Sequence, residues 1–340
     1  MVRSLLLAFC ILVFPGCRSL AASDTLAPIS TSPDEKTERD AILGKVQAAI
    51  AASDFAALNG MEEEFRSSRA RMPSGLWKLA VFHAGLQFYL AKGLERQFDC
   101  QYRTAEFIAK WAAAAPDNPA PVITDAAMLD KQAWCFRGGG YADHVAQGDW
   151  PKFRKGVAAA FGTLEQHSAT ASADPEYYAV KLGVLRDMSA SPEAFHTFLD
   201  EAVAREPDYH RTYFMAVWSY LPQWGGSYAA VEQFARYAAD QTSGSEQDGL
   251  YARIFWSLEE CGCEIVKVAA DWPRMKQAMR DVYNLYPVAS NSEYFTDLAC
   301  RMGDVEEGRR YLRAAHPEFT DDASFAPMFT YCDSRAQMGK

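Results

Sequence analysis

The stretch at 220–227, with the sequence YLPQWGGS, constrains the fold of this chain more than any other. Apolar side chains on both sides of it recur in steps of three and four residues, the spacing of one face of an α-helix. Pro222 lacks an N–H and is expected to end the first helix. Gly225 and Gly226 accept backbone angles that side chains forbid, and Ser227 is a good N-cap for a second helix. The stretch therefore predicts the hinge of a helical hairpin.

Similar helix starts occur upstream of this hinge. Asp174 is followed by Pro175, and Ser191 is followed by Pro192. A capping residue with proline in the first turn is a strong start signal, because that proline breaks no helical hydrogen bond. Ser74 is likewise expected to cap a helix that begins close after it.

The spacing of these signals predicts a repeated unit. One helix pair occupies 174–207 and the next 208–242. Both are close to the period of about 34 residues of tetratricopeptide-type hairpins. Helical patterns continue through most of 38–340, and alternating β-branched runs are absent. We expect an all-α fold in which tetratricopeptide-like helical hairpins stack as an α-solenoid.

The N-terminus is typical of an export signal at 1–21. Arg3 supplies a positive charge, and the apolar run at 5–14 is shorter than the roughly 20 residues that a membrane span needs. Two cleavage sites are compatible with this pattern. A Gly-Cys pair directly after the run favours a lipoprotein signal with Cys17 as the lipid-bearing residue, and ordinary cleavage after Ala21 is the alternative. Either site predicts the periplasmic side of a bacterial cell envelope.

The segment at 22–37 is rich in Ser, Thr, Pro and Asp, and predicts a flexible tether before a helical-repeat domain at 38–340. The chain has 340 residues and a formal net charge of −10, and it lacks a basic run. Such a chain is a poor candidate for binding nucleic acid or an anionic membrane surface. We therefore expect membrane association only through a lipid at the N-terminus.

Cysteine usage predicts disulfide bonds. Beyond the signal region six cysteines remain, an even number: Cys100, Cys135, Cys261, Cys263, Cys300 and Cys332. In an exported protein this favours disulfides, and we expect Cys100 to pair with Cys135 because both lie on adjacent predicted helices. Cys261 and Cys263 would then pair with the two remaining cysteines. A thiolate metal site is the alternative, but the spacing of Cys261 and Cys263 is narrower than in zinc sites, so no metal is predicted.

Four segments together resemble a known family. They are WKL at 77–79, WCFRGGGY at 134–141, DPEYY at 174–178 and the stretch at 220–227. In this order they resemble an uncharacterised bacterial family of tetratricopeptide-like helical proteins, catalogued as a domain of unknown function. The resemblance covers 74–258 and excludes the cysteine-rich end. It implies a helical-hairpin fold and implies no activity.

Motifs for known chemistry are absent from the sequence. The six histidines form no H-E-x-x-H pair, and there is no G-x-S-x-G elbow and no phosphate-binding P-loop. We therefore predict no catalytic residue and no cofactor. A catalytic triad is recognised by its geometry, which the sequence does not contain.

Five residues are candidates for binding. Arg137 precedes three glycines whose N–H groups could hold an anion, and His144 follows them; a plain helix end is the competing interpretation. Trp224 could stack on a sugar or a peptide side chain, or it could pack two helices together. Tyr213 could belong to an aromatic binding face or to the core, and His210 could join Arg137 and His144 in a pocket.

We expect a non-enzymatic interaction or scaffold module, because stacked hairpins present an extended concave surface to another protein. Its partner would be an envelope protein or peptide. The alternatives are an envelope hydrolase of unknown substrate, or a glycan- or peptide-binding protein, with a pocket near Arg137 and His144. A histidine within hydrogen-bond reach of a carboxylate or serine in a deep pocket would favour the enzyme. A broad aromatic groove would favour binding.

Overall fold

The computed structural model describes residues 26, 28–30, 34–92, 94, 99–258 and 265–316. This part of the chain is helical, and its single pairing of strand type is a bridge between Arg71 and Trp77. The all-α prediction is confirmed. The predicted signal region, including Cys17, lies outside the described residues.

The N-terminal helices are α1 (Glu35–Ala52), α2 (Phe55–Ser68), α3 (Lys78–Leu90), α4 (Ala105–Ala114), α5 (Ala120–Arg137), η2 (Ala142–His144), α6 (Asp149–Gln166) and α7 (Ser168–Ala171). The central helices are α8 (Glu176–Asp187), α9 (Pro192–Arg205), α10 (His210–Ala216), η3 (Val217–Tyr220), η4 (Pro222–Trp224) and α11 (Tyr228–Gln241). The C-terminal helices are α12 (Ser243–Glu246), α13 (Gly249–Ser257), α14 (Ile265–Ala269), α15 (Trp272–Leu285), α16 (Ala289–Met302) and α17 (Val305–Ala315).

Several helix starts follow the sequence signals. The side chain of Ser191 accepts a hydrogen bond from the N–H of Ala194, and Ser227 does the same for Ala230. The prediction for Ser74 is wrong. α3 begins at Lys78, and Ser74 lies buried in the preceding loop because its backbone has partners elsewhere in the fold. At the N-terminus, α1 begins at Glu35, inside the segment predicted as a tether.

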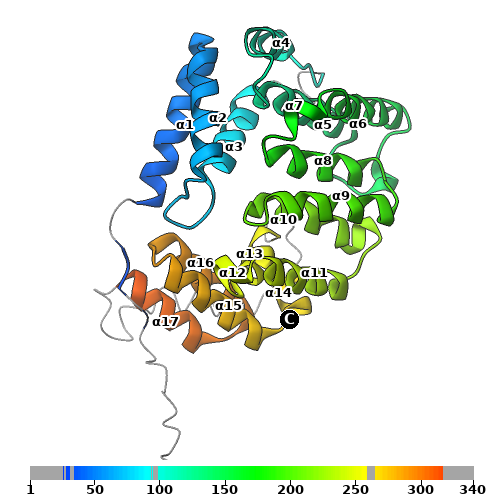
Figure 1. Ribbon diagram of the computed structural model, residues 1–340. Helices are drawn as coiled ribbons and strands as arrows, with labels where there is room; N and C mark the ends of the chain where they lie inside the picture. Colours follow the sequence, from blue (N-terminus) through cyan, green and yellow to red (C-terminus); the bar gives the residue numbers. More distant parts are fainter. Residues whose placement is uncertain are drawn as a thin grey trace, which may run out of the picture.

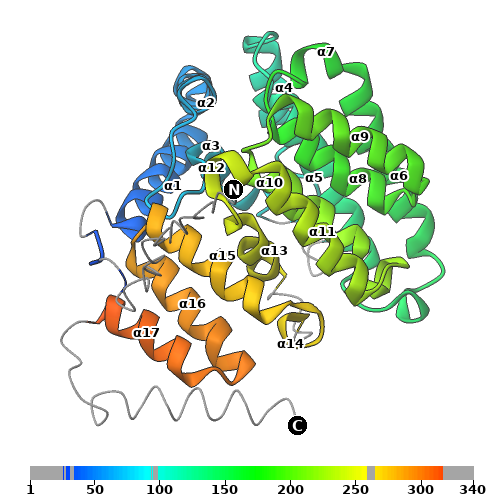
Figure 2. The same cartoon turned by 60° about the horizontal axis from the view of Figure 1, so that its bottom comes forward.

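The helices follow one another around a curved path, in which α1 to α3 lie near α15 to α17 (Figure 1). Neighbouring helices such as α5 and α6, or α16 and α17, pack together, and so do helices two apart, such as α8 with α10 and α13 with α15. The view in Figure 2 shows α13, α15, α16 and α17 side by side in the C-terminal part. Apolar side chains form three buried clusters along this path, centred on α1–α3, on α5–α8 and on α8–α17.

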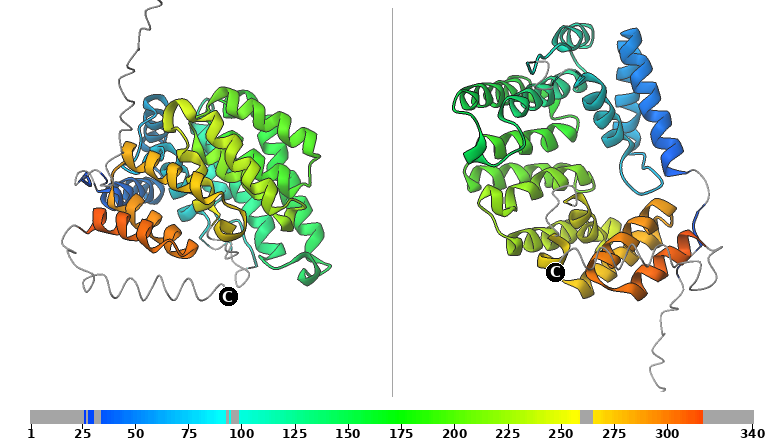
Figure 3. Two further views of the ribbon diagram at one scale, coloured as in Figure 1. Left: turned by 90° about the horizontal axis from the view of Figure 1, so that it is seen from below. Right: turned by 180° about the vertical axis from the view of Figure 1, so that it is seen from behind.

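The curved row of helices from α1 to α17 is called the array below. The loop at 69–77, between α2 and α3, contacts both its N-terminal and its C-terminal helices. The backbone carbonyl of Ser74 accepts hydrogen bonds from Arg253 Nη2 in α13, at 2.8 Å, and from Asn291 Nδ2 in α16, at 3.3 Å. The N–H of Ser74 donates to the Glu35 carboxylate at 2.9 Å. A second link is the bond from the N–H of Ser30 to the carbonyl of Pro287. Figure 3 shows from behind that the N-terminal and C-terminal helices lie next to each other.

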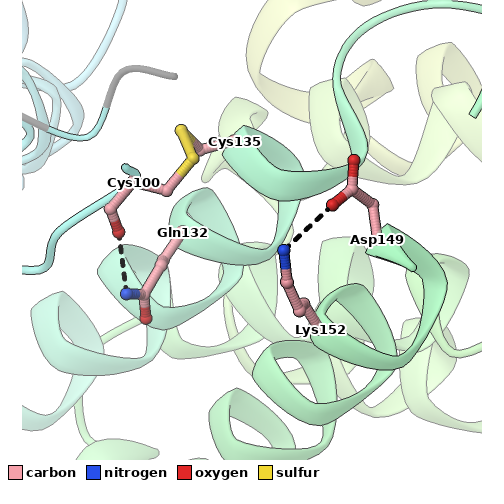
Figure 4. The surroundings of a disulfide bond; sticks show 5 residues. All are labelled: Cys100, Gln132, Cys135, Asp149 and Lys152. Atoms are coloured by element: carbon pink, nitrogen blue, oxygen red, sulfur yellow. Dashed lines mark hydrogen bonds and ion pairs between the residues drawn. A yellow bond between two sulfur atoms is a disulfide. The ribbon is translucent and has the colours of Figure 1, made fainter. Parts of the chain in front are cut away.

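The predicted disulfide between Cys100 and Cys135 is confirmed (Figure 4). Cys135 lies in α5, whereas Cys100 lies in the loop before α4, where Gln132 donates a hydrogen bond to its carbonyl. Cys300 is also disulfide-bonded. Cys261, Cys263 and Cys332 lie outside the described residues, so the rest of the predicted pairing stays a prediction. None of the described helices is both long and apolar enough to cross a membrane.

A substitution at Gly75 tests whether the contacts between the two ends of the array stabilise the fold. Gly75 has a φ of +94°, and an added Cβ would lie 2.5 Å from Tyr286 and 2.7 Å from the Arg253 guanidinium. We predict that Gly75→Ala lowers the free energy of unfolding by about 1–3 kcal/mol, because the methyl group is strained and displaces the closing contacts. Denaturant titration followed by circular dichroism measures this.

The matched control is Gly44→Ala. Gly44 is exposed in α1, and no atom lies within 4 Å of its added Cβ. Alanine there should leave stability unchanged or raise it by up to about 1 kcal/mol, because it removes backbone entropy from the unfolded chain. Equal effects at Gly75 and Gly44 would contradict the structural role of the loop at 69–77.

Candidate functional site

The predicted hinge at 220–227 joins α10 to α11 through two short 3₁₀ turns. α10 ends earlier than expected, because the turn η3 tightens the backbone before Pro222 is reached, and Pro222 instead opens η4. Gly225 follows in the left-handed conformation, with a φ of +86°. At Gly226 a Cβ would lie 2.0 Å from the carbonyl oxygen of Tyr220. Glycine is required at both positions for the chain to turn back here.

A pocket with a volume of about 390 Å³ lies beside this hinge and the turn between α8 and α9. We refer to it as the hinge pocket. It is lined by Arg186, Ser189, Ala190, Pro192, Phe195, His196, Ser219, Tyr220, Trp224, Gly225 and Gly226. The lining combines aromatic and apolar walls with a guanidinium, an imidazole and hydroxyl groups, and it includes no carboxylate. Apolar walls with a few polar groups are common in ligand-binding pockets.

The guanidinium of Arg186 is held on two sides. Its Nε and Nη2 donate to the two carboxylate oxygens of Asp187 at 2.8 and 3.1 Å. Its Cζ lies 4.8 Å from the centre of the Trp224 ring, in a cation–π contact. Asp187 is itself buried and accepts a further hydrogen bond from Trp134 Nε1 at 2.6 Å. Arg186 therefore enters the pocket in a fixed orientation.

Trp224 also contacts aromatic side chains that do not line the pocket. The rings of Trp134 and Trp224 meet edge to face, with centroids 6.0 Å apart. On its other side Trp134 contacts the guanidinium of Arg137 at 4.7 Å, and Arg137 also lies 5.5 Å from Trp150. The predicted residues Arg137 and Trp224 thus belong to one connected set of rings and cations, but only Trp224 lines the pocket.

A pair of acids lies beneath the fixed arginine. Asp130 in α5 is hydrogen-bonded to Asp187, and its other carboxyl oxygen is buried without a partner. Burial and the neighbouring charge of Asp187 together hold the pKa of Asp130 well above its usual range, against the opposing effect of Arg186. The protonated form of Asp130 is therefore favoured where it contacts Asp187.

The opposite wall of the pocket is also ordered by hydrogen bonding and stacking. Tyr220 Oη and His196 Nε2 lie 2.9 Å apart, and the Tyr220 ring stacks on Phe234 at 4.6 Å. Burial raises the pKa of Tyr220, so its hydroxyl stays neutral and available for hydrogen bonding. Trp224, Tyr220 and His196 thus surround the same space with restricted side chains.

A separate polar cluster is buried away from the pocket. His83 Nε2 lies 2.7 Å from Asp174, and both are inaccessible to solvent. Burial opposes the charged imidazole, but Asp174 outweighs it and raises the pKa of His83. In the described part of the chain no hydroxyl or thiol is hydrogen-bonded to His83, so this pair lacks the nucleophile of a hydrolase. The described residues also contain no cluster of His, Cys, Asp and Glu that could hold a metal ion.

The structure separates the residues that sequence patterns suggested. Arg137 donates to the carbonyls of Gly138 and Gly140, as expected for a helix end, and His144 lies exposed beside that turn. His210 is buried 3.6 Å from Glu246, and burial lowers its pKa to about 4. Tyr213 is completely buried in the core.

Three important residues of the site were not among the sequence candidates: Asp130, Arg186 and Asp187. They come from α5 and α8, and their contacts span up to 57 positions in sequence, as between Asp130 and Asp187. An adjacent Arg-Asp pair at a helix end is too common a pattern to single out. Only the packing of α5 against α8 brings the acids together.

Comparisons with known proteins add no name to this site. No family model, curated protein or solved structure matches the chain.

The Asp130 carboxyl predicts a pH dependence of stability. Its pKa is higher in the folded than in the unfolded chain, so its contribution to stability is complete below the unfolded pKa and is lost as the pH rises through the folded pKa. Asp130→Asn keeps a donor for Asp187 without needing a proton. Relative to this variant, the wild type should lose up to about 1.4 kcal/mol per pH unit above about pH 4.

Urea titrations of both proteins from pH 4 to pH 8 measure the difference. Asp117→Asn, at an exposed carboxylate on the surface, is the control and should follow the wild type. Parallel pH profiles for wild type and Asp130→Asn would contradict the protonated state of the pair.

Proposed function

We propose that this chain is a non-enzymatic protein-interaction module of the bacterial cell envelope, built of tetratricopeptide-like hairpins stacked as an α-solenoid. The packing of helices two apart, such as α8 with α10 and α11 with α13, supports this arrangement, since stacked hairpins make that contact in each layer. The proposed location in the envelope rests on the export signal predicted at 1–21 and on the Cys100–Cys135 disulfide, because disulfides persist in oxidising compartments.

The observation that carries the proposal is the hinge pocket. It places Trp224, Tyr220 and His196 around one accessible space of about 390 Å³, beside a fixed arginine. Aromatic and arginine side chains are enriched where proteins bind one another, because they combine large apolar area with directional hydrogen bonds. A pocket of this size accepts a side chain of a partner rather than a whole domain face.

The alternative of an envelope hydrolase finds less support. Arg137 is engaged by backbone carbonyls of its own turn, and His210 is buried beside Glu246 instead of joining His144. Tyr213 has no exposed surface, so it serves the core. Of the five candidate binding residues, Trp224 is the one that we retain in the proposed site.

Photo-crosslinking tests the interaction. We predict that benzoylphenylalanine at Gln223, an exposed position of η4 beside Trp224, forms a discrete adduct with one partner in cells that express the chain. Adding Trp224→Leu should abolish at least about nine-tenths of the adduct, because loss of a central aromatic anchor costs 1.4 kcal/mol or more. Mass spectrometry of the adduct identifies the partner and the attachment site.

The control position is Lys155, which is exposed on α6 and does not line the pocket. Benzoylphenylalanine there should not give the same adduct. Circular dichroism must show that Trp224→Leu leaves the fold intact. An adduct that is absent at Gln223, or that persists in the Trp224→Leu protein, would refute binding at the hinge pocket.

A further inference from the structure

The donor that faces the hinge pocket is positioned before any ligand is present. Arg186 uses Nε and Nη2 for Asp187, and its plane is stacked on Trp224. Asp187 is in turn held by Trp134. An arginine fixed in this way loses little conformational entropy when it binds an acceptor, so its remaining N–H groups are preorganised.

Part of this guanidinium remains open. Nη1 of Arg186 donates to no atom of the described residues and is not among the fully buried polar atoms, and Arg186 lines the pocket. His196 engages Tyr220 through Nε2, which leaves Nδ1 without a partner in the described part of the chain. The pocket therefore offers fixed nitrogen groups to an incoming oxygen acceptor.

The lining has a consistent electrostatic character. The hinge pocket contains no carboxylate, although the chain as a whole carries a net charge of −10. A second pocket, between α11 and the end of α14 with the turn after it, provides the contrast: there Arg236 is bonded to both Glu232 and Asp271. Asp187 pairs with Arg186 from outside the lining, so an acidic ligand would meet no carboxylate among the lining residues of the hinge pocket, whereas Glu232 and Asp271 line the second pocket.

The Arg186 guanidinium lies close to the aromatic wall of the pocket. This arrangement indicates where a ligand would carry its carboxylate. The Arg186 guanidinium lies directly on the Trp224 ring, at 4.8 Å, and Phe195 and Pro192 complete the apolar side. A ligand must therefore carry its carboxylate and its large apolar side chain close together. The C-terminal residue of a peptide does so within one residue, whereas an internal Asp or Glu places its acid on a different side chain from the apolar group.

The backbone of the hinge leaves room for such a ligand. No atom lies within 4 Å of the Cβ position of Gly225, which lines the pocket. The volume of about 390 Å³ is at the lower end for a ligand site, and it suits one terminal residue better than an extended segment.

We propose that the hinge pocket captures the C-terminal residue of a partner protein, with the terminal carboxylate at Arg186 and a large apolar side chain against Trp224 and Phe195. This inference rests on the proposed interaction function and specifies the ligand class of the same site. Capture of a free C-terminal carboxylate by fixed donors is a recurrent mode of peptide recognition.

Calorimetric titration with three short peptides tests it. The probes are acetyl-Ala-Ala-Phe as the free acid, the same peptide as its amide, and acetyl-Ala-Asp-Phe-amide, in which the acid is internal. The free acid should bind at least about tenfold more tightly than either amide, because only it places a carboxylate at Arg186 beside the aromatic side chain. Equal binding of the acid and either amide would overturn the inference.

Substitutions in the two pockets test whether Arg186 is the group that recognises the free acid. Arg186→Lys keeps the positive charge but removes the planar group that stacks on Trp224, and it should remove the preference for the acid. Arg236→Lys makes the same change in the second pocket and should leave binding unchanged. Thermal melts establish that both variants are folded. An unaltered preference in Arg186→Lys, or loss of it in Arg236→Lys, would overturn the assignment.

The two proposals fail in different ways. If the Trp224-dependent crosslink at Gln223 forms but the free acid shows no preference, the interaction function stands and the C-terminal specificity is wrong. If no Trp224-dependent crosslink forms, the interaction function itself is wrong at this site. Absence of any binding by the free acid also counts against the C-terminal specificity.

Discussion

Among the links that hold the array closed, one is a buried guanidinium, that of Arg253, whose side chain has no exposed surface. Its Nε donates to Glu246 at 2.9 Å, and its Nη2 donates to the carbonyl of Ser74 at 2.8 Å. Burial favours a neutral carboxyl, but the charge of Arg253 outweighs it and lowers the pKa of Glu246, so the carboxylate form of Glu246 is favoured. Breaking such a buried pair from one side costs about 3–5 kcal/mol, because the remaining charge is left without compensation. The loop that carries Ser74 is therefore tied to α13 by a strong constraint.

This constraint reaches the hinge pocket through α10. Trp77, at the end of the same loop, meets the ring of Tyr209 edge to face at 5.4 Å. Tyr209 donates a hydrogen bond to Glu176 at 2.7 Å, and Arg211 holds the same carboxylate at 2.7 Å. These contacts fix the beginning of α10 and of α8; α8 carries Arg186 near its far end, and α10 leads through η3 to η4, which carries Trp224. Closure of the array and rigidity of the pocket thus depend on one connected set of side chains.

The sequence predicted what depends on local contacts. The caps Ser191 and Ser227 and the glycines of the hinge act through neighbours within a few positions, so their patterns are visible in the chain itself. Ser74 misled the prediction, because its partners Arg253 and Asn291 lie 179 and 217 positions away. No local pattern distinguishes a serine that caps a helix from one that closes an array.

The residues of the candidate site likewise fall into two groups: those that local sequence patterns predict, and those that only helix packing brings together. Trp224 stood out because a tryptophan beside two glycines is conspicuous, and it does line the pocket. Arg186, Asp187 and Asp130 define its chemistry, but they meet only when α5 packs on α8. Tyr213 and His210 lie on the buried face of the helices, and their burial is decided by the curvature of the whole array.

A distance between the two ends of the array tests closure most directly. Spin labels on unnatural amino acids at Gln47 in α1 and Glu306 in α17, both exposed, leave the cysteines untouched. Pulsed electron paramagnetic resonance should give one narrow distance distribution in the wild type and a broad one in Arg253→Met, with helix content retained. A broad distribution in the wild type, or an unchanged narrow one in Arg253→Met, would contradict closure through Arg253.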